Sequence, residues 1–324
     1  MDVDEAGGDD LAAGVDLLRP TPGHLADLDD LPAGDRHIGL EGLAAAAIHH
    51  GAAADHHIQI GHGTSPSLCR QDGPGDGPVN RLPRGASCPE RGRYRNVANI
   101  LLIHGAYQGG WIWTRVAARL RAAGHLVLAP SLDGCAERAH AIRPRITTES
   151  QAEELASLLF HEDWRDAVVA GTSTGGMVMC KLAELAPERI GRLVFADALA
   201  LQDGEKLPDI VARPTAVNTE LTSGPSRADA EGRLFAELDA GTRAWTLERI
   251  CQHPILPMTA PVVLPRFWSM PWQASVVWCR RSQNPPVAHQ RRLQQALRAA
   301  WHELDTGHYP MLSEPAALAG LIAE

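Results

Sequence analysis

Aromatic residues and lysine are missing from the first quarter of the chain. Residues 1–93 contain no Phe, Trp, Tyr or Lys, although the 324-residue chain has 8 Trp, 4 Phe and 3 Tyr. A segment with so few large apolar side chains buries too little surface to offset the entropy lost when it orders. We therefore predict a low-complexity, disordered segment over residues 1–95 and a folded domain over residues 96–324.

The same segment carries most of the net charge. Residues 1–95 contain 15 Asp and Glu against 8 Arg, and so account for −7 of the net −9. This negative balance argues against a nucleic-acid partner. Because the domain pattern starts abruptly at Val97, the segment is either a genuine tail or translated GC-rich sequence ahead of an alternative start codon at Val97. In both cases we expect it to be dispensable.

Long hydrophobic runs and paired cysteines are also absent. No run approaches the roughly 18 apolar residues of a membrane span, and the acidic start lacks the apolar core of a signal peptide. The six cysteines show no spacing typical of zinc sites or disulfides, and Cys180 and Cys279 are expected to be buried free thiols. These absences predict a cytoplasmic protein that needs no membrane, metal or other cofactor. The candidate metal-ligating histidines are interpreted as part of a solvated low-complexity stretch: His49, His50, His56 and His57.

Apolar runs alternate with helical patterns along the predicted domain. This alternation is typical of an α/β protein with a mostly parallel sheet and helices on both faces. Thr148 and Gln151 have the spacing of a capping box at a helix start. Residues 199–265 are rich in proline and polar residues, without strand character, and are predicted to form a helical lid over the carboxyl edge of the sheet. Strands are expected at 96–105, 125–130, 167–170, 192–196, 274–279 and 301–304, and helices at 114–124, 148–160, after Ser173, at 287–300 and at 314–324.

One pentapeptide concentrates the chemistry of the chain. Residues 171–175 read G-T-S-T-G, directly after an apolar run and directly before a helical pattern. Strand, tight turn and helix are the context of a nucleophile elbow, in which the backbone at Ser173 is strained and its hydroxyl is exposed. Glycines flank the serine because a Cβ there would collide with a neighbouring strand or helix. The alternative is a Gly/Ser turn that merely joins two elements.

Four sequence motifs follow one another between residue 97 and the C-terminus. They read I-L-L-I-H-G-A-Y-Q-G-G-W-I-W, G-T-S-T-G-G-M-V, L-V-F-A-D-A-L-A-L-Q-D-G-E and E-L-D-T-G-H-Y-P-M-L. This order resembles the α/β-hydrolase superfamily, and it looks closest to the branch of plant methyl-salicylate esterases, hydroxynitrile lyases and bacterial carbamate-hydrolysing esterases. The resemblance implies the α/β-hydrolase fold and a serine mechanism.

The resemblance also implies roles for individual residues. Ser173 matches the nucleophile, and His308 matches the general base that accepts its proton. The backbone N–H groups of Ala106 and Thr174 match the oxyanion hole. His104 is expected to brace the oxyanion loop.

The acid of the triad departs from the family pattern. The family's acid usually follows the strand at 274–279, but that loop has no carboxylate here. Asp197, which ends the neighbouring strand, is the preferred candidate to orient His308. Ser282 or Asn284, or no third member, are the alternatives.

Large aromatic residues suggest the substrate class. Aromatics in a lid and an oxyanion loop suit an apolar or aromatic ester, although core packing is the alternative for each. We therefore expect a serine esterase that cleaves a small-molecule carboxylic ester through an acyl-enzyme, or an amide or carbamate at the same site. A hydroxynitrile-type lyase would carry a lysine after His308, where Tyr309 stands, and a non-catalytic receptor would not need both Ser173 and His308. The substrate-binding candidates are Tyr107, Trp111, Trp113, Trp268 and Trp272.

Overall fold

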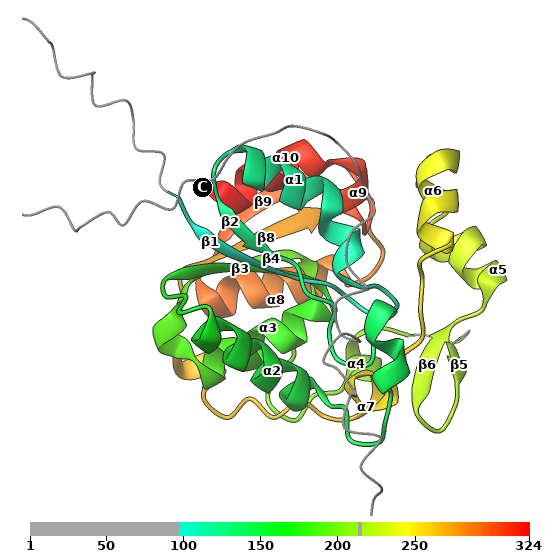
Figure 1. Ribbon diagram of the computed structural model, residues 1–324, viewed down its shortest axis with the longest axis horizontal. Helices are drawn as coiled ribbons and strands as arrows, with labels where there is room; N and C mark the ends of the chain where they lie inside the picture. Colours follow the sequence, from blue (N-terminus) through cyan, green and yellow to red (C-terminus); the bar gives the residue numbers. More distant parts are fainter. Residues whose placement is uncertain (1–96, 213–215) are drawn as a thin grey trace, which may run out of the picture. The chain divides into compact units, whose positions relative to one another are not determined.

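The computed structural model describes residues 97–212 and 216–324 (Figure 1). The predictions for residues 1–95, with those for the four histidines there, lie outside the described residues.

The centre of the described chain is a six-stranded sheet in the order β2-β1-β3-β4-β8-β9. Every neighbouring pair of strands is parallel, so all of the strands end at the same edge of the sheet. The predicted parallel sheet is confirmed. Its strands are β1 (Asn99–Ile103), β2 (Leu126–Leu128), β3 (Ala167–Ser173), β4 (Ile190–Ala198), β8 (Ala274–Cys279) and β9 (Ala300–Leu304).

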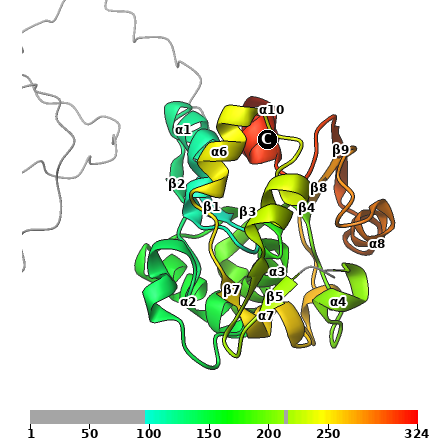
Figure 2. The ribbon, with the colours of Figure 1, turned by 90° about the vertical axis from the view of Figure 1, so that its right-hand side faces the viewer.

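Helices cover both faces of this sheet (Figures 1 and 2). On one face lie α1 (Thr114–Ala122), α9 (Pro310–Ser313) and α10 (Pro315–Ala323). On the other face lie α2 (Thr148–His161), α3 (Gly175–Leu185) and α8 (Val287–Leu297). Each helical layer packs against the sheet and forms a separate buried apolar cluster with it. This confirms the predicted α/β architecture.

The start of α2 corrects one local prediction. Thr147, not Thr148, is the N-cap, and its hydroxyl accepts the backbone N–H of Ser150 at 3.1 Å. The Ser150 hydroxyl in turn accepts the backbone N–H of Thr147 at 2.9 Å. Gln151 is instead buried, and its Nε2 donates to the carbonyl oxygen of Asp133 at 3.0 Å. Two overlapping polar pairs in the sequence could each have formed the capping box, and burial of Gln151 decides between them.

The predicted lid contains strands as well as helices, so the prediction of a segment without strand character is wrong. Three short antiparallel strands in the order β5-β6-β7 lie within residues 199–265. They are β5 (Ala216–Asn218), β6 (Thr222–Pro225) and β7 (His253–Pro254). Strands this short, and partly made of glycine and proline, leave no alternating apolar pattern in the sequence.

Short helices make up most of the rest of the lid segment and of the connections. In the lid, seen in yellow and green in Figure 2, they are α4 (Leu207–Ile210), α5 (Arg227–Asp229), the π-helix η4 (Ala230–Leu234), α6 (Ala240–Leu247) and α7 (Ile255–Thr259). The 3-10 helices are η1 (Gly110–Trp113), η2 (Ala136–Ala141), η3 (Pro187–Arg189) and η5 (Phe267–Ser269).

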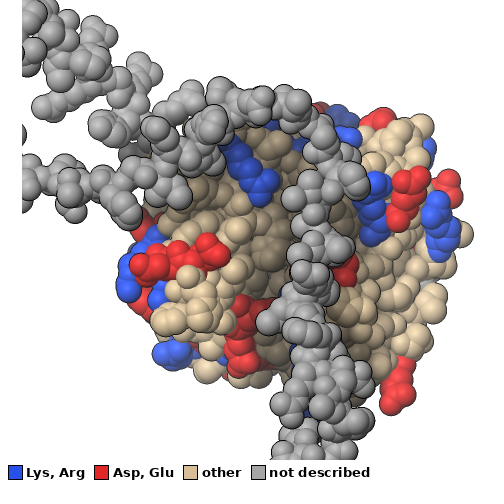
Figure 3. Space-filling model, viewed as in Figure 1, with Lys and Arg blue, Asp and Glu red and all other residues tan. Residues whose placement is uncertain are grey.

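Two cysteines, the lengths of the helices and the surface charge can be described for the same residues. Cys180 and Cys279 are buried free cysteines, as predicted. Within residues 97–212 and 216–324, no helix combines the length and apolar character needed to cross a membrane. On the face shown in Figure 3, acidic and basic side chains are interspersed. The described side chains on that face therefore do not form a broad field of one sign.

Candidate active site

The turn at Ser173 has the backbone strain that the pentapeptide predicts. Ser173 ends β3 with a φ of 51°, a left-handed conformation that non-glycine residues rarely adopt. A Cβ on Gly175 would lie only 2.5 Å from the carbonyl oxygen of His104, and one on Gly171 would lie 3.0 Å from the carbonyl oxygen of Gly175. The two glycines therefore let β3, α3 and the end of β1 approach closely enough to present the serine at the carboxyl edge of the sheet.

The loop after β1 passes directly beside this serine. A Cβ on Gly105 would be 2.6 Å from the Cβ of Ser173, so only glycine allows this approach. The backbone N–H of Gly105 donates to Oε1 of Gln108 at 3.3 Å, which ties the loop to itself. Ala106 follows, and it lines the same cavity as Ser173 and Thr174. Thr174 is the N-cap of α3, where the helix dipole favours negative charge.

His104 lies beneath this loop as a buried, neutral brace. Its Nδ1 donates to the carbonyl oxygen of Gly105 at 2.8 Å, and its Nε2 accepts the backbone N–H of Leu132 at 2.9 Å. Burial lowers its pKa from 6.5 to about 4, so both hydrogen bonds belong to the uncharged ring. The histidine thus joins the end of β1 to the segment that follows β2.

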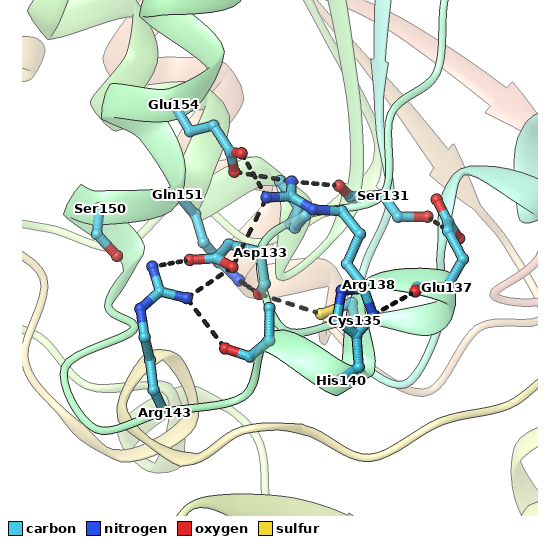
Figure 4. A network of polar contacts seen from close by, with 12 residues as sticks. Ser131, Asp133, Cys135, Glu137, Arg138, His140, Arg143, Ser150, Gln151 and Glu154 are labelled. Atoms are coloured by element: carbon cyan, nitrogen blue, oxygen red, sulfur yellow. Dashed lines mark hydrogen bonds and ion pairs between the residues drawn. The ribbon is translucent and has the colours of Figure 1, made fainter. Parts of the chain in front are cut away.

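That segment is itself held by a polar network (Figure 4). The hydroxyl of Ser131 accepts the backbone N–H of Gly110 and donates to Glu137, both at 2.8 Å. Arg138 donates to the carbonyl oxygen of Ser131 and to the carboxylate of Glu154 on α2. The loop after β1 is therefore anchored through η2 to a helix of the domain core.

The predicted lid segment is also joined to the loop after β1. The backbone N–H of Cys251 donates to the carbonyl oxygen of Tyr107 at 3.0 Å. Its thiol donates to the carbonyl oxygen of Gln108 at 3.3 Å. Two consecutive carbonyl groups beside Ala106 thus hydrogen bond to one residue of the lid.

Asp197 and His308 form a direct hydrogen bond. Nδ1 of His308 lies 2.6 Å from Oδ2 of Asp197, whose side chain is fully buried. Because a carboxylate only accepts, Nδ1 carries the proton of this bond, and in the neutral ring Nε2 then has a lone pair that can accept another proton. The other two candidates for the third position are placed differently: the hydroxyl of Ser282 donates to the carbonyl oxygen of Asn284 at 3.1 Å, and Asn284 lines the cavity.

A cavity of about 90 Å³ lies beside Ser173 and His308. Ser173, His308, Ala106 and Thr174 line it from the carboxyl edge of the sheet. Leu207, Val211, Pro225, Leu234 and Met258 are among the residues that line it from the lid, so its wall is largely aliphatic. The charged lining residues Asp229 and Arg233 are paired: Nε of Arg233 donates to Oδ1 of Asp229 at 2.7 Å.

The five aromatic substrate-binding candidates occupy different places in the structure. Tyr107 lines the cavity, but the four tryptophans do not. Trp113 is completely buried in the core under α1, and Trp111 packs edge-on against Trp245 at 5.3 Å. Trp268 and Trp272 pack against Phe267, at 5.1 and 5.5 Å. All four contribute buried area to packing, which is the usual role of such large side chains.

Sequence reasoning missed several lining residues. Gln108, Met258 and the pair Asp229–Arg233 all border the cavity. The i, i+4 spacing of Asp229 and Arg233 is a signal for a helical ion pair, but it does not reveal which face the pair occupies. For residues 97–212 and 216–324, no group of three or more His, Cys, Asp or Glu side chains is arranged to hold a metal ion.

Comparison with known proteins places this fold and site in a family. The model of the alpha/beta hydrolase family matches residues 100–321. The chain belongs to that family, as its four motifs predict.

Two relatives illustrate the branch. The chain is 35% identical over 130 residues to a carbendazim hydrolyzing esterase of Nocardioides sp. (strain SG-4G), covering 40% of this chain and 54% of the relative. It is 29% identical over 139 residues to methylesterase 3 of Arabidopsis thaliana, covering 42% and 50%. The chain spans about half the length of these curated relatives. They match the branch that the sequence motifs indicate.

A solved structure supports the fold. An extracellular alpha/beta-hydrolase from a Paenibacillus species, described as sharing structural and functional homology with tobacco salicylic acid binding protein 2, superposes with a TM-score of 0.60. The match covers 69% of this chain and 97% of that one at 20% sequence identity. At this identity the likeness concerns the fold alone.

Proposed function

We propose that the protein is a serine carboxylesterase that cleaves a small apolar ester through an acyl-enzyme. The observation that carries the proposal is the hydrogen bond between His308 Nδ1 and Asp197 Oδ2, at 2.6 Å, beside a cavity that Ser173 also lines. A serine hydroxyl attacks poorly unless a correctly oriented base accepts its proton. The bond to Asp197 leaves the Nε2 lone pair of His308 for that task.

The reaction follows from the roles of these groups. Oγ of Ser173 attacks the ester carbonyl carbon while Nε2 of His308 takes the hydroxyl proton. The N–H groups of Ala106 and Thr174 hold the resulting oxyanion, and Asp197 stabilises the imidazolium. His308 then returns its proton to the leaving alcohol. A water molecule attacks the acyl-enzyme by the same steps, which releases the acid and restores Ser173.

The cavity supports a small, uncharged substrate. Its wall is mainly aliphatic, and its two charged lining residues, Asp229 and Arg233, neutralise one another. Burial of an unpaired charge in such a site would be costly. A carbamate or amide is the second candidate, since one relative is named a carbendazim hydrolyzing esterase. A lyase of the hydroxynitrile type is disfavoured because Tyr309, not lysine, follows His308.

A panel of p-nitrophenyl esters with acyl chains of increasing length tests the proposal, with a p-nitrophenyl carbamate in parallel. We expect the highest kcat/KM for short acyl chains, no turnover in Ser173→Ala, and labelling of Ser173 by a fluorophosphonate probe. Turnover of the carbamate alone would shift the proposal to the second candidate. Ester hydrolysis that persists in Ser173→Ala would contradict the serine mechanism.

A further inference from the structure

A lid carboxyl group lies against the segment that carries His308. A Cβ placed on Gly307 would be 1.3 Å from Oε2 and 2.0 Å from Oε1 of Glu237. The carboxyl group of Glu237 therefore occupies space that is open only because residue 307 is glycine. Glu237 as a whole is exposed, but its carboxyl end reaches the backbone of the segment directly before the histidine.

A second contact holds the same two segments together. The rings of Phe235 and Tyr309 lie 4.7 Å apart, and both residues are buried. Phe235 and Glu237 come from one turn of the lid, while Gly307 and Tyr309 flank His308. The lid segment thus contacts the segment around His308 in two places: Phe235 packs against Tyr309, and the carboxyl group of Glu237 lies against Gly307.

Opposing influences act on the pKa of the Glu237 carboxyl group. Burial raises the pKa of its carboxyl group, and the charge of Asp197 acts in the same direction. The charge of His308 and the backbone N–H groups of His308 and Tyr309 oppose this by favouring the carboxylate. Other titratable groups that interact with Glu237 are Cys279 from β8, Arg281 from the loop after it, and the Tyr309 hydroxyl.

We propose that Glu237 is a positioning residue for His308. Its carboxylate holds the backbone of the Gly307–Tyr309 segment in place and adds negative charge near the imidazole, so that a lid residue completes the orientation of the base. The usual loop for the triad acid holds no carboxylate here, and its Arg281 pairs with Asp305 at 2.6 Å. Glu237 supplies from the lid a second carboxylate beside the histidine. This inference rests on the proposed catalytic role of His308.

The test compares Glu237→Gln and Glu237→Ala with Glu231→Gln, an exposed glutamate on η4 in the same lid segment. We expect Glu237→Gln to lower kcat by about 10- to 100-fold with little change in KM, because misplacement of a catalytic group by about 1 Å costs that much. The acid limb of its kcat/KM profile should move to lower pH, because the charge that favours the imidazolium is gone. Glu231→Gln should match the wild type in both respects.

Thermal unfolding separates this role from a purely structural one. The amide oxygen of Glu237→Gln can still accept the backbone N–H groups of His308 and Tyr309, so the variant should keep its Tm while it loses activity with the negative charge. A contact that only supports the fold would instead lose Tm and activity together. Unchanged kcat and an unchanged pH profile in Glu237→Gln would overturn the proposal.

A readout without turnover keeps the inference separate from the proposed function. In a Ser173→Ala background, NMR would follow the ring resonance of His308, identified by its absence in His308→Gln. We expect Glu237→Gln to lower the pH at the midpoint of that titration, and Glu231→Gln to leave it in place. A wild type without any esterase activity would refute the function alone, whereas an unmoved midpoint in Glu237→Gln would refute the role of Glu237.

Discussion

Asp197 and His308 are 111 residues apart in the chain, yet Nδ1 of the histidine lies 2.6 Å from Oδ2 of the aspartate. The other oxygen, Oδ1, is buried and has no hydrogen-bond partner within the described residues. The hydrogen bond to His308 is therefore made by one carboxylate oxygen of Asp197 alone. Asp197→Asn would replace this acceptor with a group that does not select the proton on Nδ1.

We predict that Asp197→Asn lowers kcat by about 10³- to 10⁴-fold, because the imidazole then adopts the wrong tautomer and its charged form loses its partner. Steady-state hydrolysis of the best p-nitrophenyl ester measures the effect. Ser282→Ala and Asn284→Ala are the matched controls, and both should retain most of the wild-type kcat. A crippled Ser282→Ala beside a nearly normal Asp197→Asn would move the third role to the loop after β8.

Ser173 and His308 should act as a unit. Ser173→Ala and His308→Ala are each expected to abolish measurable esterase turnover, and the double variant should be little worse than either single one. Kinetics of the three variants, with circular dichroism to check the fold, measure this. Additive losses in the double variant would mean that the two side chains contribute to separate steps.

Gly175→Ala should disrupt the elbow. Its Cβ would lie 2.5 Å from the carbonyl oxygen of His104 and 2.7 Å from that of Ile103, both backbone atoms at the end of β1. We expect a loss of about 1–3 kcal/mol in the free energy of unfolding, typical of overpacking, and a marked loss of activity. Gly320→Ala on α10 is the control, since nothing lies within 4 Å of its added Cβ. It should be neutral or stabilising.

Acid should destabilise the fold through two buried histidines. Burial lowers the pKa of His104 from 6.5 to about 4. Burial, with the charge of Arg292, lowers that of His289 by the same amount. Between these pH values the unfolded chain binds protons that the folded chain does not. The free energy of unfolding should therefore be fully present above pH 6.5 and fall as pH is lowered toward 4, by up to about 1.4 kcal/mol per pH unit for each histidine.

His289→Gln isolates one of these contributions. In the wild type, Nε2 of His289 accepts the backbone N–H of Ala200 at 3.1 Å, and a glutamine oxygen can replace that acceptor. Urea unfolding at pH 7, 6 and 5 should show a shallower pH dependence in the variant, by at most the share of one histidine. An identical slope in the two proteins would mean that the pKa of His289 does not differ between the folded and unfolded states.

A double-mutant cycle tests the contact between Glu237 of the lid segment and Gly307 beside His308. Gly307→Ala should expel the Glu237 carboxyl group, because its Cβ would fall 1.3 Å from Oε2. We expect Gly307→Ala and Glu237→Ala to lower kcat to a similar extent, and the double variant to lose little more than either. Independent, multiplicative losses in kcat would show that the two residues do not act through one contact.

The sequence predicts the parts of this molecule that depend on local pattern. The glycines at 171 and 175 predict the strained backbone at Ser173, whose φ is 51°, and the apolar run at 274–279 coincides with β8. The antiparallel strands of the lid escape prediction because β7 is only His253–Pro254. The sequence does not distinguish Trp113, which is buried in the core, from an aromatic residue that borders a site, because the two look alike in sequence. The contact of Glu237 with Gly307 depends on chain folding that no spacing in the sequence encodes.

The hydrogen bonds from Cys251 to the carbonyl groups of Tyr107 and Gln108 restrict how such an enzyme can diverge. Under the proposed function, Cys251 joins the lid segment to the loop whose Ala106 N–H group would hold the oxyanion. Exchange of the lid for that of a relative would therefore change turnover together with substrate preference. Evolution of a new specificity in this scaffold would proceed more readily through single substitutions that face the cavity than through replacement of the whole segment.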